Sequence, residues 1–177
     1  TMHPKIKIIL IHGNGGGWPK ENWLPPVAKK LSKLKGVEVT FRRFPDSILA
    51  RAKYWLPFIK KLGADEHTIL VGHSSGAVAT MRYAEKHKIL GSILVATCYT
   101  DLGVHEEKLS GYYNKPWNWK AIRNNQKWIA QFASVDDSFI PIEEARFIHK
   151  KLATEYYEFK HQGHFSSWDN KTDFPQI

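Results

Sequence analysis

The sequence predicts an α/β fold in three layers (α/β/α), in which helices cover both faces of a parallel sheet of about six strands. Short runs rich in β-branched and aromatic residues alternate with longer helical patterns along the 177 residues. This alternation is typical of right-handed β–α–β crossovers. Several of the runs are apolar nearly throughout, as expected for strands buried on both faces. The expected strands cover residues 6–11, 37–41, 68–71, 92–97, 128–133 and 156–159.

Two helices are expected from apolar residues that recur at steps of three and four, which is the spacing of a stripe facing the core. Pro57 interrupts the first stripe, so we expect that helix to be kinked or split near Leu56. The two stripes consist of Ile48, Ala52, Trp55, Ile59 and Leu62, and of Ile142, Ala145, Ile148 and Leu152.

Length and composition predict one domain over residues 1–177, because 42% hydrophobic residues suit a single continuous core. No apolar segment approaches the ~20 residues that a membrane-spanning helix needs, and the run 6–11 is too short for a signal-peptide core. We therefore expect no membrane association and a cytoplasmic, or also nuclear, location. The single cysteine, Cys98, cannot form an internal disulfide and is expected to be a buried thiol.

The net charge of +9 raises the question of nucleic-acid binding, because basic domains attract phosphate nonspecifically. The lysines, however, are spread over four expected helices, which is the usual pattern of a solvated surface. No zinc-finger, RNP or basic-zipper motif accompanies the charge. The sequence therefore predicts no specific nucleic-acid partner.

Residues 72–76 read Gly-His-Ser-Ser-Gly and lie between an expected strand and a small-residue helical stretch. A serine at such a sharp strand-to-helix turn is a candidate nucleophile, here Ser74. Gly72 and Gly76 fit this reading, because the tight turn strains the backbone and leaves no room for side chains at either position. The alternative is an ordinary glycine-rich turn in which Ser74 caps the next helix.

A serine hydroxyl needs a base, and the base needs an acid that fixes its tautomer. Asp136 and Asp137 follow the fifth expected strand, and His161 and His164 follow the sixth. The resulting chain order of Ser, Asp and His is that of an α/β-hydrolase. We favour His164 over His161 because Gly163 permits an unusual backbone angle beside it. The alternative for His164 is a solvent-exposed loop histidine.

The glycine-rich loop 12–17 follows the first strand. It lacks the Lys-Ser or Lys-Thr of a phosphate loop, and Trp18 stands where G-x-G-x-x-G requires its third glycine. Beside a nucleophilic serine, one amide of such a loop joins the amide after the nucleophile to bind an oxyanion. We expect Asn14 and Ser75 to supply these N–H groups, with Gly15 competing for the role of Asn14.

With these motifs the chain resembles the α/β-hydrolase superfamily, and more closely its small serine hydrolases related to retinoblastoma-binding protein 9. The resemblance runs from about residue 6 to about residue 165. It rests on residues 13–17, 55–58, 72–76, 81–85, 110–113, 116–117, 136–137 and 163–165.

The resemblance implies a compact fold with a minimal lid and no metal or organic cofactor. It implies hydrolysis of small carboxyl esters or related acyl substrates, aminoacyl compounds included, through a Ser-His-Asp triad and an acyl-enzyme. It also favours Asp137 as the triad acid, because the family commonly follows that aspartate with two residues, an apolar residue and a proline, as 137–141 do. Asp136 would then cap the loop or point to solvent.

Two departures limit what the resemblance implies. Ala64 stands where the Leu-x-Cys-x-Glu segment proposed to engage the retinoblastoma protein has its cysteine, so we do not predict that partner. The stretch 169–177 is polar where relatives usually end in an apolar helix, so the last flank of the sheet is expected to be partly uncovered or covered differently.

Aromatic residues are the candidate walls of a substrate pocket. Trp18 lies beside the glycine-rich loop, and Tyr112 and Trp117 lie in the excursion after the fourth strand. The alternative is ordinary packing of these large side chains. The fold does not select the leaving group, so the sequence leaves esterase and peptidase classes open. It also leaves open a protein-interaction module with a weak or vestigial triad.

Overall fold

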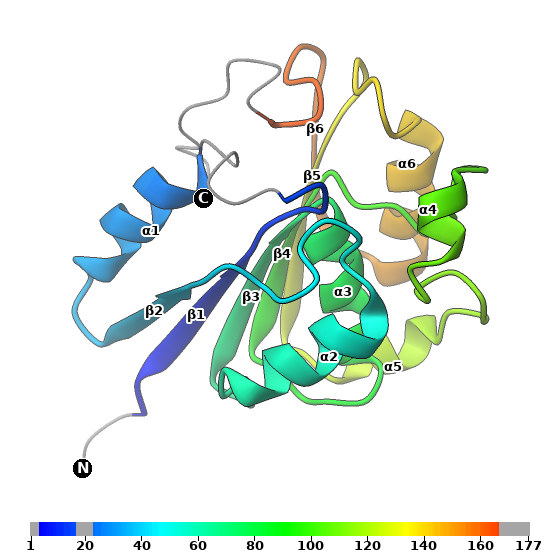
Figure 1. Ribbon diagram of the computed structural model, residues 1–177. Helices are drawn as coiled ribbons and strands as arrows, with labels where there is room; N and C mark the ends of the chain where they lie inside the picture. The colour runs from blue at the N-terminus through cyan, green and yellow to red at the C-terminus, as the bar shows by residue number, and fades with distance from the viewer. Residues whose placement is uncertain (1–3, 17–22, 167–177) are drawn as a thin grey trace.

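The structure is a computed structural model that describes residues 4–16 and 23–166. Within these residues, six parallel strands form one sheet in the order β2-β1-β3-β4-β5-β6 (Figure 1). The strands are β1 (Ile6–Ile11), β2 (Val37–Phe41), β3 (Thr68–His73), β4 (Gly91–Val95), β5 (Trp128–Ser134) and β6 (Glu155–Phe159).

Helices flank the sheet on its two sides, which gives the predicted three layers. In Figure 1, α2, α3, α5 and α6 gather on one side, while α1 lies apart from them beside β2. The helices are α1 (Leu24–Ser32), α2 (Ala52–Lys61), α3 (Ser75–Ala84), α4 (His105–Lys108), α5 (Trp119–Asn124) and α6 (Ile142–Leu152). The α/β class and the parallel sheet are thus confirmed.

The strand ends differ slightly from the predicted ones for local reasons. β3 continues two residues past the predicted end, because Gly72 and His73 still pair with Leu94 and Val95 of β4. β4 stops at Val95, since Ala96 turns to a φ of +53° and leaves the extended conformation.

The first predicted helix needs a correction. α2 begins at Ala52, so Ile48 lies in the preceding loop, where 71% of it is exposed. Pro57 does not split the helix, which runs unbroken past it to Lys61. Pro57 has no backbone N–H to donate to the Lys53 carbonyl. Both residues lie on the exposed face, so water can donate to that carbonyl instead.

The strand order places a switch point between β1 and β3. From β1 the chain adds β2 on one side, and it then crosses back to place β3 on the other. Loops that leave the carboxyl ends of the two strands at such a point diverge, and ligands bind in the crevice between them. The glycine-rich loop and Ser74 follow these two strands. Among the described residues, no helix is long and apolar enough to cross a membrane.

Candidate active site

Ser74 stands alone between the end of β3 and the start of α3, in a backbone conformation that L-residues rarely adopt. Its φ is +56° and its ψ is −117°. The crowding around it explains both glycines. A Cβ on Gly76 would lie 2.3 Å from the Ile11 carbonyl oxygen, and one on Gly72 would lie 2.4 Å from the Gly76 carbonyl oxygen. The strained turn therefore holds the Ser74 hydroxyl above the carboxyl edge of the sheet.

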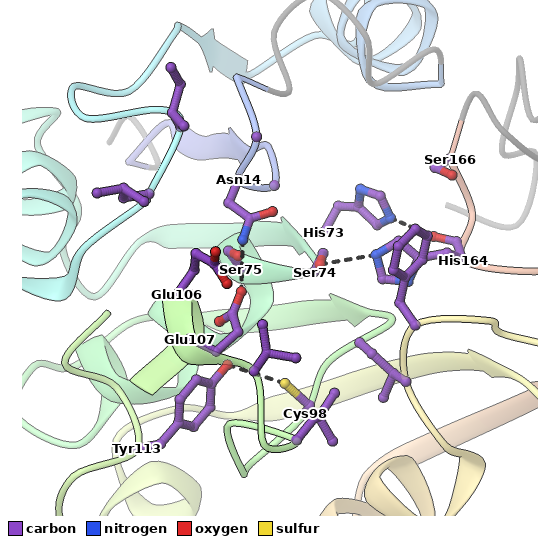
Figure 2. A pocket seen from close by; sticks show the side chains of 18 residues that line it. Asn14, His73, Ser74, Ser75, Cys98, Glu106, Glu107, Tyr113, His164 and Ser166 are labelled. Atoms are coloured by element: carbon purple, nitrogen blue, oxygen red, sulfur yellow. Dashed lines mark hydrogen bonds between the residues drawn. The ribbon is translucent and has the colours of Figure 1, made fainter. Parts of the chain in front are cut away.

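The structure brings the three predicted residues into one hydrogen-bonded row. His164 Nε2 lies 3.0 Å from Ser74 Oγ, and Figure 2 shows this contact. The other ring nitrogen, Nδ1, lies 2.9 Å from Asp137 Oδ2. The side chains of His164 and Asp137 are 12% and 4% exposed, so water barely reaches their contact. Asp137 Oδ1 accepts from the amides of Phe139 and Ile140, which fixes the carboxylate. Spacing and burial are those needed for proton transfer from Ser74 to an oriented imidazole.

The neighbouring Asp136 holds the loop that carries His164. Its Oδ1 accepts from Ser134 Oγ at 2.6 Å and from the Gly163 amide at 2.8 Å. The hydrogen bond from Ser134 is the main cause that lowers the pKa of Asp136. Gly163 has a φ of +54°, the unusual angle anticipated beside His164. Of the two alternatives for Asp136, the structure shows the loop cap.

Two further side chains fix the backbone around His164. Nε2 of His73 lies 2.7 Å from the His164 carbonyl oxygen. Because that oxygen can only accept a hydrogen bond, Nε2 of His73 carries the ring proton. Trp23 Nε1 donates to the Phe165 carbonyl at 2.8 Å. Sequence reasoning did not assign these roles; the signal for His73 is only its place inside the nucleophile motif.

The residues predicted to supply the oxyanion donors both line the cavity beside Ser74. Ser75 is the first residue of α3, and amides of a first helical turn have no intrahelical acceptor. Asn14 lines the same cavity from the loop after β1. Its competitor Gly15 donates its amide to the Ile48 carbonyl at 2.8 Å, which leaves Asn14 as the better candidate.

His12 shapes this loop. Its Nε2 accepts from the Phe44 amide at 2.9 Å, so the ring proton is on Nδ1. That Nδ1 donates to the Gly13 carbonyl at 2.7 Å. His12 is fully buried against the rings of Phe44 and Trp55. The base of the glycine-rich loop is therefore rigidly anchored.

A cavity of about 520 Å³ opens over Ser74. Apolar side chains form much of its wall, and the carboxylates of Glu106 and Glu107 enter it from α4 (Figure 2). No lysine or arginine lines it among the residues that the structure describes. The apolar lining residues are Ile48, Leu49, Cys98, Leu102, Val104, Tyr113, Phe139 and Ile140.

The aromatic residues predicted as pocket walls lie elsewhere. Tyr112 is 1% exposed and belongs to the core, and Trp117 packs against the Arg82 guanidinium 3.6 Å from its ring centroid. Neither lines the cavity, because both serve to pack the excursion between β4 and α5 onto the domain. The neighbouring Tyr113 lines it instead. Trp18, the third candidate, lies outside the described residues.

Sequence reasoning missed the pair Glu106 and Glu107; the available signal was two adjacent acids in the loop that follows the fourth strand. Burial raises the pKa of Glu107, and hydrogen bonds from Asn14 and Tyr113 act in the opposite direction.

Cys98 is buried as expected, and its burial raises the thiol pKa to about 12. It therefore stays a neutral thiol beside the Tyr113 hydroxyl, 3.2 Å away.

Comparison with known proteins places this chain in a family. A family model described as serine hydrolase matches residues 8–177. The chain belongs to the serine hydrolase family. Serine hydrolase RBBP9 of Rattus norvegicus is 42% identical to it, over a match that covers 99% of this chain and 94% of the rat protein.

Solved structures agree with this assignment. The crystal structure of the ydeN gene product from B. subtilis matches this serine hydrolase with a TM-score of 0.84 at 25% identity, over 96% of this chain and 93% of that chain. The esterase domain of a Rhodothermus marinus protein matches in fold, with a TM-score of 0.66 at 13% identity, over 97% and 83%. The serine hydrolase thus has the α/β-hydrolase fold, and hydrolysis is its general activity.

Proposed function

We propose that the protein hydrolyses small carboxyl esters and related acyl compounds, with Ser74 as nucleophile, His164 as base and Asp137 as the orienting acid. The observation that carries the proposal is the position of the His164 ring, whose two nitrogens lie 3.0 Å from Ser74 Oγ and 2.9 Å from Asp137 Oδ2. An imidazole held between a hydroxyl and a carboxylate can take a proton from one while the other stabilises the resulting charge.

The reaction proceeds in two acyl-transfer steps. Ser74 Oγ attacks the acyl carbonyl carbon while His164 Nε2 takes its proton, and the N–H groups of Asn14 and Ser75 bind the oxyanion. The oxyanion collapses and expels the leaving group, which receives the proton from His164. Water then attacks the acyl-enzyme with His164 again acting as base, and the acid product leaves with Ser74 restored.

Turnover of a neutral activated ester, such as 4-nitrophenyl butyrate, tests this proposal. We expect Ser74→Ala to lower kcat by at least about 10⁴-fold, because it removes the hydroxyl that lies 3.0 Å from the base. Ser75→Ala is the matched control, since it removes a neighbouring hydroxyl and leaves the backbone N–H in place. Equal turnover by wild type and Ser74→Ala would overturn the proposal. A folded wild type that binds a protein but shows no turnover would favour the interaction module.

The charges of the cavity narrow the substrate class. The charged carboxylates that line it among the described residues belong to Glu106 and Glu107, on the side of the cavity beside Ser75 and Asn14 (Figure 2). A substrate carboxylate placed there would be repelled, and an ammonium group would be attracted. We propose that acyl groups bearing an amine, aminoacyl esters among them, are preferred over acyl groups bearing an acid.

Three 4-nitrophenyl esters of similar size test this preference: 4-aminobutyrate, butyrate and hemisuccinate. We expect kcat/KM to fall in that order, with about tenfold between the first and the last. Glu106→Gln should shrink the ratio of amine to acid substrate within the same preparation. A preference for hemisuccinate, or a ratio unchanged in Glu106→Gln and in Glu107→Gln, would contradict the proposal.

A further inference from the structure

We propose that Glu107 is a positioning residue, which holds the loop carrying the Asn14 N–H in place beside Ser74. Asn14 Nδ2 donates to Glu107 Oε1 at 2.8 Å, and this bond joins the loop after β1 to α4 across 93 residues of sequence (Figure 2). The inference rests on the proposed function, because it concerns the oxyanion donor of that reaction.

The loop also has anchors outside α4. The amides of Gly15 and Gly16 donate to the carbonyls of Ile48 and Ser47, at 2.8 and 3.0 Å. Both glycines have positive φ, near +70°, so this backbone has access to conformations closed to other residues. The bond from Asn14 to Glu107 ties the loop to α4 as well. It therefore fixes the direction of the Asn14 peptide, on which the oxyanion contact depends.

Glu107 is itself held firmly enough to act as an anchor. Its backbone carbonyl accepts from the Ser110 hydroxyl at 2.6 Å and from the Ser110 amide at 3.1 Å. The Ser110 carbonyl in turn accepts from the Ala52 amide at the start of α2. The Tyr113 hydroxyl also lies close enough to the Glu107 carboxylate to lower its pKa, and that hydroxyl lies 3.2 Å from the Cys98 thiol. Glu107 thus links the start of α2, through Ser110, to the loop after β1.

The charge of Glu107 cannot explain its place in the cavity through direct catalysis. A carboxylate close to a developing oxyanion opposes that oxyanion, so a purely electrostatic contribution would slow the reaction. What the carboxylate supplies is an acceptor at a fixed point. A glutamine keeps that acceptor and removes the charge, and this separates the two effects.

The experiment measures kcat and KM for neutral 4-nitrophenyl butyrate, and the inhibition constant of an alkyl trifluoromethyl ketone that forms a tetrahedral adduct. Removal of an entire oxyanion donor costs about 10²–10³ in kcat, so a misdirected donor should cost less. We expect Glu107→Ala to lower kcat about 10–100-fold with KM changed less than about threefold, and to raise the inhibition constant in parallel. Glu107→Gln should restore most of kcat.

Asn14→Ala gives a second route to the same contact, because it removes the side chain and keeps the backbone N–H. It should lower kcat as Glu107→Ala does, and the double variant should be no slower than either single one. Lys108→Ala, an exposed change on the same helix outside the cavity lining, is the control and should match wild type.

The outcomes separate this inference from the function on which it rests. An active wild type with unchanged kcat in both Glu107→Ala and Asn14→Ala overturns the inference alone. So does a Glu107→Gln variant as slow as Glu107→Ala, or a double variant that shows the product of the single losses. A wild type without turnover overturns the proposed function and the inference with it.

Discussion

Asp136 and Asp137 are neighbours in the chain, yet their carboxylates make different contacts. Asp137 faces the Nδ1 of His164, whereas Asp136 accepts from the Gly163 amide of the loop that carries His164. The Asp137 carboxylate therefore orients the His164 ring, and the Asp136 carboxylate fixes the backbone that carries this ring. The residues alone left either aspartate as the candidate acid, and only the family pattern that follows Asp137 favoured Asp137.

The two asparagine variants should differ sharply in turnover. Asp137→Asn removes the charge that stabilises the imidazolium and allows the wrong tautomer, so we expect kcat to fall by about 10⁴-fold in a folded protein. Asp136→Asn keeps an Oδ1 that can accept from Ser134 and Gly163, so its loss should stay below about tenfold. Steady-state kinetics with circular dichroism spectra measures both. Similar losses in the two variants would refute our assignment of the acid.

Residues at strand ends were the most predictable part of the site. Ser74, Asp137 and His164 each follow an expected strand, and the parallel sheet brings such positions to one edge. Tyr112 and Trp117 were not predictable, because the excursion after β4 has no period that tells which side faces the cavity. Trp117 donates its indole N–H to the Tyr99 carbonyl, a contact that only the fold reveals.

At the scale of elements, Arg82 of α3 fastens the excursion between β4 and α5. Its side chain is 1% exposed and pairs with Glu85 at 2.9 Å. Its guanidinium also donates to the carbonyls of Tyr112, Lys115 and Pro116. Arg82, on the helix that begins beside Ser74, therefore contributes several of the contacts that hold the segment between α4 and α5.

Removing this fastening should destabilise the whole domain. Arg82→Met leaves Glu85 buried without its partner and three carbonyls without a donor, which should cost about 3–5 kcal/mol in the free energy of unfolding. Urea denaturation measures this loss. Arg146→Met is the control, because the Arg146–Glu158 pair is exposed and its loss should change stability little. Equal stability of the two variants would show that Arg82 does not fasten the excursion.

The elements themselves were largely predictable, because nearly continuous apolar runs mark buried parallel strands. The exceptions have local causes. The helical spacing that begins at Ile48 continues into α2, but the chain forms a loop there, fixed by Asp46, which accepts from the Arg51 amide and guanidinium. A side chain that bonds its neighbouring backbone competes with the helix, and spacing alone does not show this.

At the scale of the whole molecule, the sheet order places the site. The loops after β1 and β3 diverge at the switch point, and the loops after β5 and β6 bring Asp137 and His164 to the same edge. Four segments far apart in sequence thereby share one cavity. The alternation of strands and helices predicted this edge. It could not predict α4, whose two glutamates define the charge of the cavity, because four residues carry too little pattern.

An activated Ser74 hydroxyl should react covalently with a fluorophosphonate probe. Peptide mapping by mass spectrometry should find one adduct per chain, on Ser74, and labelling should be absent in Ser74→Ala and strongly slowed in His164→Ala. An adduct on another residue, or a wild type that remains unlabelled while correctly folded, would contradict the account.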